Sequence, residues 1–287
     1  MRSRNLITAA LCAVAAVVVS AAMTWVVPPP EADASGGEGG RGGAAAPLRA
    51  LGDGAEPGSG TSAPPAGGPA RTAVPPPSGP RAPGSPPAFV GTLFPAGLTG
   101  GHYCTATVVR SPGRDLIVTA GHCLTEGPTG SGGAVFAPGY ADGRAPYGTW
   151  RLTEVTEDPR WARDGEDAYD LAFARLAPDL TGRRVEEVTG AAPLDTRGRT
   201  RETVTVTGYP SAADAPHTCT ATAALPDPEL QRFDCAGFPT GTSGSPWIAR
   251  DGRIVGVLTG GDTDDRSTST VLGPWAGALY ARATAGR

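Results

Sequence analysis

Three short segments hold the side chains that could act together in catalysis. In the first, an apolar run ends in His122; in the second, Asp170 comes directly before another apolar run; in the third, Ser243 lies among glycines. A serine hydroxyl is a weak nucleophile at its free pKa, so it needs an adjacent base. The base in turn needs a third group that fixes its tautomer and stabilises its cation. His122, Asp170 and Ser243 together meet these needs.

The glycines around Ser243 indicate a site for a developing oxyanion. Because glycine has no Cβ, the backbone can turn tightly and aim the N–H groups of Gly241 and Ser243 at one point. The sequence therefore predicts these two amides as an oxyanion hole.

Each segment also has an interpretation without catalysis, as a core histidine, a strand start or a loop. The order His, Asp, Ser and the strand context favour the catalytic interpretation. Asp167 is the alternative acid, and Ser245 is the serine that is passed over as nucleophile. An α/β-hydrolase elbow is excluded, because G-x-S-x-G would need a glycine where Ser245 stands and because that triad runs Ser, Asp, His. We interpret His102 and His217 as surface or structural residues.

The elements that must position these groups are short strands. Apolar stretches rich in Val, Leu, Thr and aromatic residues are separated by Gly, Pro and Asp turns, and one Ala-rich helix is expected at 275–285. This pattern favours an antiparallel all-β protein closed into barrels. The expected strands are 88–94, 104–109, 116–119, 148–155, 171–176, 203–208, 245–249 and 254–259, with a hairpin turn at Asp251-Gly252 between the last two.

On the three segments, the chain resembles the chymotrypsin-like (trypsin-fold) serine peptidases, and most closely the bacterial secreted branch that includes the glutamyl endopeptidases. The resemblance covers about 89–280 and includes the family's order of segments. It implies His122 as the general base, Asp170 as its orienting carboxylate and Ser243 as the nucleophile.

The resemblance also implies the architecture. A peptidase domain at 88–287 would contain two antiparallel β-barrels, at about 88–186 and 187–287, with the cleft between them. The strand ending at Thr259, with Gly260 and Gly261, is similar to the family's substrate-binding edge.

The sequence departs from the family at the positions that set activation and specificity. Thr242 stands where digestive members carry an aspartate that pairs with a new amino terminus, and a neutral threonine does not make that ion pair. A preference for a basic substrate residue needs an acid at the base of the pocket, and no acid is evident near Gly237 unless Asp234 points inward. Leu258 and Thr259 stand where glutamate-specific relatives hold a histidine. The resemblance therefore implies neither a preference for basic residues nor one for glutamate.

Outside the apolar run 6–27, which contains Cys12, the other four of the five cysteines fall into two couples that are close in sequence, Cys104 with Cys123 and Cys219 with Cys235. An even number in an exported chain predicts two disulfides. Zinc is the competing interpretation, but neither couple has C-x-x-C spacing. The Cys104–Cys123 bridge beside the histidine also belongs to the family resemblance.

Composition divides the chain of 287 residues into parts. Residues 28–87 hold 15 of the 30 prolines and 14 of the 42 glycines, which predicts a disordered linker. The apolar run 6–27, preceded by Arg2 and Arg4, predicts a signal peptide at 1–27 or an uncleaved signal anchor that would tether the chain to the membrane. Either places the domain outside the cytoplasm. A net charge of −4 without a basic stripe argues against nucleic acid as a partner.

The sequence thus predicts an extracellular serine endopeptidase, a monomer that acts on a protein or peptide substrate with no metal or organic cofactor. Activity should rise from about pH 6 to 7, as an unperturbed imidazole loses its proton. The alternatives are an inactive homologue that serves as an extracellular binding module, and an esterase on the same scaffold. The sequence does not predict which residue is preferred beside the cut.

Overall fold

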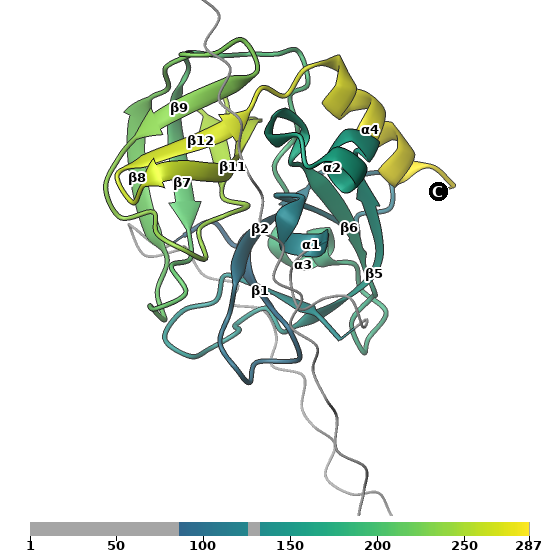
Figure 1. Cartoon of the computed structure of the whole chain (residues 1–287). Coiled ribbons are helices and arrows are strands. Elements are labelled where there is room, and N and C mark those ends of the chain that lie inside the picture. Colours follow the sequence, from purple (N-terminus) through teal and green to yellow (C-terminus); the bar gives the residue numbers. More distant parts are fainter. Residues whose placement is uncertain (1–85, 126–132, 287) are drawn as a thin grey trace, which may run out of the picture. The chain divides into compact units, whose positions relative to one another are not determined.

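The computed structural model of the chain describes residues 86–125 and 133–286. The predicted export segment 1–27, and all of the predicted linker except its last two residues, lie outside the described residues. The described residues form two antiparallel β-sheets joined by loops and short helices (Figure 1). None of their helices has the length and apolar character needed to cross a membrane.

The first sheet is a closed barrel with the strand order β1-β2-β3-β6-β5-β4. Every neighbouring pair in it is antiparallel, which allows the short connections seen between consecutive strands. Its strands are β1 (Val90–Phe94), β2 (Cys104–Val109), β3 (Leu116–Thr119), β4 (Val135–Pro138), β5 (Trp150–Glu157) and β6 (Ala172–Leu176).

The second sheet has six antiparallel strands in the order β8-β7-β10-β11-β12-β9. Among the described residues its edge strands β8 and β9 are not paired with each other, so this sheet is the half-barrel that accompanies the closed barrel, and the predicted two-barrel architecture is confirmed. The Cys219–Cys235 disulfide joins edge strand β8 to the end of β9. The strands are β7 (Thr203–Gly208), β8 (His217–Thr222), β9 (Leu230–Asp234), β10 (Pro246–Ala249), β11 (Ile254–Thr263) and β12 (Arg266–Thr270).

The core explains why β3 is apolar on both faces. Ile117 points into the first barrel, whereas Leu116 and Val118 pack in a second cluster with residues of β11 and of the C-terminal helix α4 (Pro274–Thr284). A strand buried on both faces is expected to be apolar at consecutive positions instead of alternate ones. β3 is therefore fixed in place by packing on two sides.

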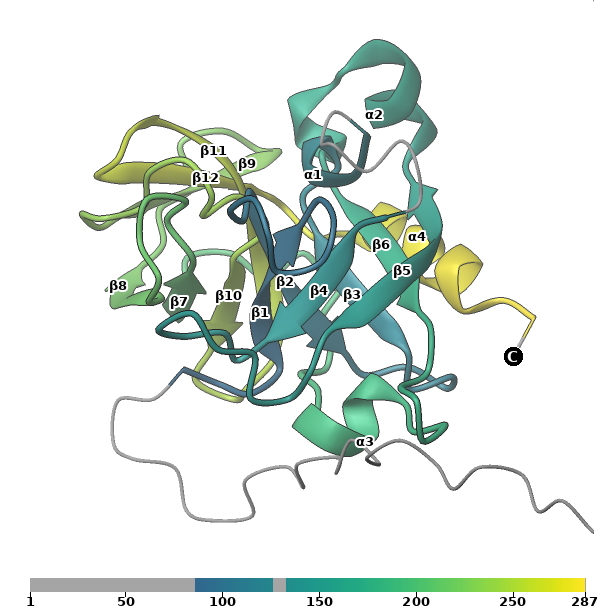
Figure 2. The ribbon, with the colours of Figure 1, turned by 90° about the horizontal axis from the view of Figure 1, so that it is seen from below.

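Helices cover the barrel at three places. Helix α4, predicted at 275–285, runs along β5 and β6, and Tyr280 Oη donates to Arg110 O at 2.8 Å (Figures 1 and 2). Figure 2 shows α1 and α2 together at one end of the barrel and α3 at the other. Four short helices were not predicted from sequence: α1 (His122–Thr125), α2 (Pro159–Asp164), η1 (Asp167–Tyr169) and α3 (Val185–Thr189).

All eight predicted strands are present, with ends shifted by at most a few residues except in β11, which continues four residues past Thr259. Four strands were missed: β4, β8, β9 and β12. Three of these are polar, and β8 is paired to β7 by a ladder of threonines such as Thr205 with Thr220, whose hydroxyls are 2.8 Å apart. Such strands are stabilised by pairing with neighbours and carry little apolar signal of their own.

Candidate active site

His122 and Asp170 meet at one end of a strand pair. β3 and β6 are antiparallel neighbours, with Thr119 opposite Ala172. The end of β3 and the start of β6 therefore lie side by side, and His122 follows the first while Asp170 precedes the second. This register brings together two residues that are 48 positions apart in sequence.

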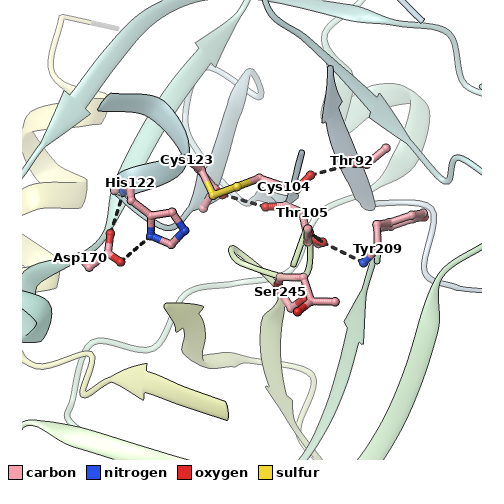
Figure 3. The surroundings of a disulfide bond; sticks show 12 residues. Thr92, Cys104, Thr105, His122, Cys123, Asp170, Tyr209 and Ser245 are labelled. Atoms are coloured by element: carbon pink, nitrogen blue, oxygen red, sulfur yellow. Dashed lines mark hydrogen bonds and ion pairs between the residues drawn. A yellow bond between two sulfur atoms is a disulfide. The ribbon is translucent and has the colours of Figure 1, made fainter. Parts of the chain in front are cut away.

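The carboxylate of Asp170 makes two hydrogen bonds to His122. Its Oδ2 lies 2.7 Å from the ring Nδ1, and its Oδ1 accepts from the backbone N–H of His122 at 2.8 Å (Figure 3). An ionised carboxylate only accepts, so Nδ1 carries the proton and Nε2 of the neutral ring is left as an acceptor. The Asp170 side chain is 5% exposed and that of His122 is 26% exposed. The acid is thus sheltered while the imidazole still reaches solvent.

Ser243 lies on the loop before β10, and this loop is held against the first barrel. Ser243 O accepts from Thr105 N at 2.7 Å. A Cβ at Gly244, which has a φ of +87°, would lie 1.9 Å from Thr105 O and 2.1 Å from Thr119 Oγ1. Only glycine fits such an approach. Because Thr119 ends β3, the serine loop docks on the strand that leads to His122.

The two serines of this loop lie in different surroundings. Ser245 is fully buried, and its hydroxyl donates to Thr242 O at 2.6 Å. Ser243 is half-buried and lines a hollow between the loop and β11. The structure therefore gives Ser245 a hydrogen-bonding role inside the loop and leaves Ser243 next to open space.

The two backbone amides predicted to form an oxyanion hole differ from the neighbouring amides of the loop in their hydrogen bonding. Thr242 N donates to Pro239 O at 3.1 Å, and Gly244 N donates to Leu258 O at 2.7 Å. Within the described residues, the amides of Gly241 and Ser243 donate no hydrogen bond. Gly241 has a φ of +97°, and a Cβ there would lie 2.5 Å from Ser211 N. Among the described residues, the amides of Gly241 and Ser243 therefore have no acceptor, whereas the Thr242 amide between them is hydrogen-bonded.

Both predicted disulfides are present. Cys104–Cys123 joins the start of β2 to α1, so it links the neighbour of Thr105 to the neighbour of His122 (Figure 3). The sulfur atoms of Cys104 and Cys123 and a ring nitrogen of His122 lie within 4.8 Å of one another. A cysteine binds zinc as a thiolate, and both of these sulfurs are used in the disulfide. This bridge therefore connects the histidine to the residue that holds the serine loop.

Thr259, Gly260 and Gly261, predicted as a substrate-binding edge, lie where β11 has left β10. β11 pairs with β10 up to Val257, whereas the pairing with β12 continues to Thr263. In the part of the chain that the structure describes, Gly260 and Gly261 pair only with β12, and Thr259 lies at an irregularity of that ladder. The other edge of this segment is not paired with β10, whose pairing with β11 stops at Val257.

Two hollows flank this edge. One, of about 280 Å³, is lined by Ser243, Phe238, Leu258, Gly260 and neighbouring residues. The other, of about 310 Å³, is lined by Asp170, Thr259, Gly260 and neighbouring residues, and it also contains the alternative acid Asp167. Asp167 thus lies beside the Asp170 carboxylate without being the one bonded to His122.

The acids of the first hollow were missed by sequence reasoning. Asp262 and Asp264 line it from the β11–β12 hairpin. Asp234, the acid considered from sequence, does not line it and instead pairs with Arg232 at 2.9 Å and Arg266 at 3.7 Å. The run of aspartates was visible in the sequence, but the expected strand stopped at Thr259, so the hairpin that carries them was not anticipated.

The two remaining histidines have contacts away from the Asp170 carboxylate. His102 is buried, and its Nε2 lies 3.0 Å from Ala213 O. His217 Nε2 lies 2.9 Å from Ala236 O, and the His217 ring packs edge-on against Phe238. Both contacts are structural, and the second supports the aromatic wall of the first hollow.

The chain is similar in sequence and fold to known proteins. Residues 104–257, more than half of the chain, match the family described as "Trypsin-like peptidase domain". No curated protein matches the chain in sequence. Protease Anisep from Arthrobacter nicotinovorans is 28% identical with a TM-score of 0.63, over 70% of this chain and 98% of that one. A thermostable serine protease, AL20, from an extremophilic microorganism is 28% identical with a TM-score of 0.61, over 70% and 99%.

A third solved structure extends the likeness in fold alone. A Glu endopeptidase is 20% identical with a TM-score of 0.56, over 70% of this chain and 92% of that one. The family match and these bacterial-type neighbours confirm the resemblance seen in the sequence. The chain belongs to the trypsin-like peptidase domain family and has the chymotrypsin-like fold.

Proposed function

We propose that the chain is an extracellular serine endopeptidase with the triad His122, Asp170 and Ser243. The observation that carries this proposal is the doubly hydrogen-bonded His122–Asp170 pair, next to the strand end on which the Ser243 loop docks. The similarity to two proteases at 28% identity supports the same reaction class.

In the proposed reaction, His122 Nε2 takes the proton of Ser243 Oγ as the hydroxyl attacks the scissile carbonyl. Asp170 stabilises the imidazolium that forms. The protonated ring then gives its proton to the leaving amine, and an acyl-enzyme remains on Ser243. Water, deprotonated by the same nitrogen, hydrolyses that ester and restores the serine. No metal or organic cofactor takes part in these steps.

The amides of Gly241 and Ser243 are proposed to bind the oxyanion. Their lack of other acceptors among the described residues means that no existing hydrogen bond has to break when the oxyanion forms. Preorganised donors of this kind are the largest single contribution in many acyl transfers, and removing one costs about 10²- to 10³-fold in rate.

The substrate is proposed to be a protein or peptide that adds as a strand to the free edge of Thr259–Gly261. The side chain that precedes the cut would enter the hollow beside Ser243. Main-chain hydrogen bonds then provide affinity and the hollow provides selectivity.

The location outside the cytoplasm is also a proposal. It is supported by the two disulfides, which persist in oxidising compartments, and by the predicted export signal. Amino-terminal sequencing of the mature protein tests whether residues 6–27 are removed or kept as a membrane tether. A monomer is expected, and sedimentation of the purified protein measures it.

A fluorophosphonate probe tests the proposed nucleophile. We expect stoichiometric labelling of Ser243, identified by mass spectrometry, and its loss in Ser243→Ala. Ser245→Ala is the matched control, because it removes a hydroxyl two residues away that is already committed to Thr242 O. An unlabelled wild-type protein would favour the binding module. Labelled protein that cleaves esters but no peptide library member would favour the esterase.

A further inference from the structure

Trp161 lies against the His122–Asp170 pair although it belongs to a different element. Its ring centroid is 6.3 Å from that of His122, with 65° between the ring planes. A Cβ added to Gly121 would lie 2.5 Å from Trp161 Cδ1 and 2.8 Å from Asp170 Oδ1. The indole edge of Trp161 and the Asp170 carboxylate oxygen therefore both pack against Gly121. Any side chain at this position would collide with both groups.

Hydrogen bonds fix the indole to the turn that carries His122. Trp161 Nε1 donates to Thr125 Oγ1 at 3.1 Å, and Thr125 Oγ1 donates to Gly121 O at 2.9 Å. Gly121 directly precedes α1, which begins at His122, and Thr125 is the last residue of that helix. The indole is thus connected to both ends of the histidine's own turn.

The helix that presents Trp161 is attached to the segment that leads to Asp170. Asp158 caps α2 by accepting from Arg160 N at 3.0 Å, and the hydrogen bond from the Arg160 side chain lowers the pKa of the buried Asp158 carboxyl. The Arg160 guanidinium carbon lies 3.4 Å from the centre of the Tyr169 ring. Since Tyr169 precedes Asp170, the helix and the acid are held in one unit (Figure 2 shows α1 beside α2).

We propose that Trp161 is a positioning residue that holds the His122 ring against Asp170 and excludes water from their hydrogen bond. A hydrogen bond between charged partners is stronger where water is excluded, and the bond from Nδ1 to Oδ2 becomes such a bond once His122 is protonated. Trp161 is not among the residues that line the two hollows. This role rests on the proposed function, in which His122 is the base.

The test compares Trp161→Leu with Arg163→Leu. Both substitutions introduce leucine on α2, but the Arg163 side chain is 72% exposed and makes only a 3.9 Å ion pair with Asp164. In Trp161→Leu, we expect the downfield NMR signal of the His122 Nδ1 proton to broaden through faster exchange with solvent. We expect kcat to fall roughly 10- to 100-fold with KM little changed, the size of effect seen when a catalytic group is slightly misplaced. Arg163→Leu should change neither.

A second variant keeps the test valid if Trp161→Leu does not fold, which circular dichroism would show. Thr125→Val keeps the indole and removes the hydroxyl that accepts from Trp161 Nε1 and donates to Gly121 O, so we expect the same changes with a smaller size. If folded variants keep a sharp Nδ1 proton signal and wild-type kcat, the positioning role is wrong. The NMR measurement needs no substrate, so it decides this role even if the wild-type protein hydrolyses no peptide and the proposed function fails.

Discussion

The two sides of the proposed catalytic groove are built in opposite ways. The base side, His122 and Asp170, lies at the ends of β3 and β6, strands whose residues are buried throughout. The pocket side, residues 258–264, lies on the part of β11 that has left its neighbour β10 and is largely exposed.

The difference is clear in the acids of the two sides. The Asp170 side chain is 5% exposed and accepts two hydrogen bonds from one residue, whereas the Asp262 side chain is 75% exposed and has a 3.6 Å contact to Arg266. A buried, fully bonded group is costly to disturb, while an exposed one interacts weakly with its surroundings. The molecule therefore confines the strict geometry to the base side and leaves the pocket side tolerant of change.

Asp170→Asn should show the strict geometry of the base side most clearly, through the largest loss of kcat among these variants. The amide can keep the bond from His122 N, but its NH₂ then faces Nδ1 and forces the proton onto Nε2, which can no longer accept from Ser243. We expect kcat to fall about 10⁴-fold with the fold intact, the loss typical for the wrong tautomer in such a triad. Stopped-flow acylation measures it, and thermal unfolding serves as the control. A loss of less than tenfold would mean that Asp170 is not the orienting acid.

Gly244→Ala and Gly260→Ala compare the contact between the serine loop and the first barrel with the pocket side. At Gly244 the new Cβ would lie 1.9 Å from Thr105 O with a φ of +87°, whereas at Gly260 the nearest atom is Thr268 Oγ1 at 3.3 Å. We expect Gly244→Ala to lower the free energy of unfolding by about 2–4 kcal/mol and Gly260→Ala by less than about 1 kcal/mol. Urea denaturation of the two variants measures both. Equal effects would contradict the docking of the serine loop on the first barrel.

Asp264→Asn should have the smallest effect and sharpens the comparison instead of breaking it. Its carboxylate lines the hollow beside Ser243, so it attracts a cation placed before the cut. An exposed pair contributes about 0.2–1 kcal/mol, which corresponds to a preference of up to about fivefold. We expect the ratio of kcat/KM for arginine against the neutral citrulline to fall by that factor, and most at low salt.

Asp265→Asn is the matched control for that substitution, because Asp265 is the next residue and does not line the hollow. A drop of equal size in both variants would show a general charge effect rather than a contribution of Asp264.

Much of the candidate site could be proposed from the sequence because its signals are local. A buried strand running into His122, an acid before an apolar strand and a serine among glycines are each visible within a few residues. The buried strands β2, β3 and β7 were predicted with their observed ends, since apolar, β-branched runs bounded by turn residues are the strongest strand signal.

Other features carry no local signal. Trp161 is nine positions from Asp170, the nearest residue of the proposed triad, and its place beside His122 and Asp170 depends on how α2 folds back over the barrel end. The polar strands β8, β9 and β12 form because neighbours accept their backbone hydrogen bonds. The acids of the hollow depend on where β11 ends, and element ends are set by pairing more than by propensity.

The sequence by itself determined which side chains are chemically able to act, because residue type and the order of segments are enough to recognise a base, an acid and a nucleophile. It also determined the pairing of the cysteines, which are close along the chain. Only the tertiary structure decided which acid bonds to His122, which serine lines a hollow and which indole lies next to the pair. Those outcomes depend on strand register and on contacts between residues far apart in sequence, and neither is encoded in any single segment.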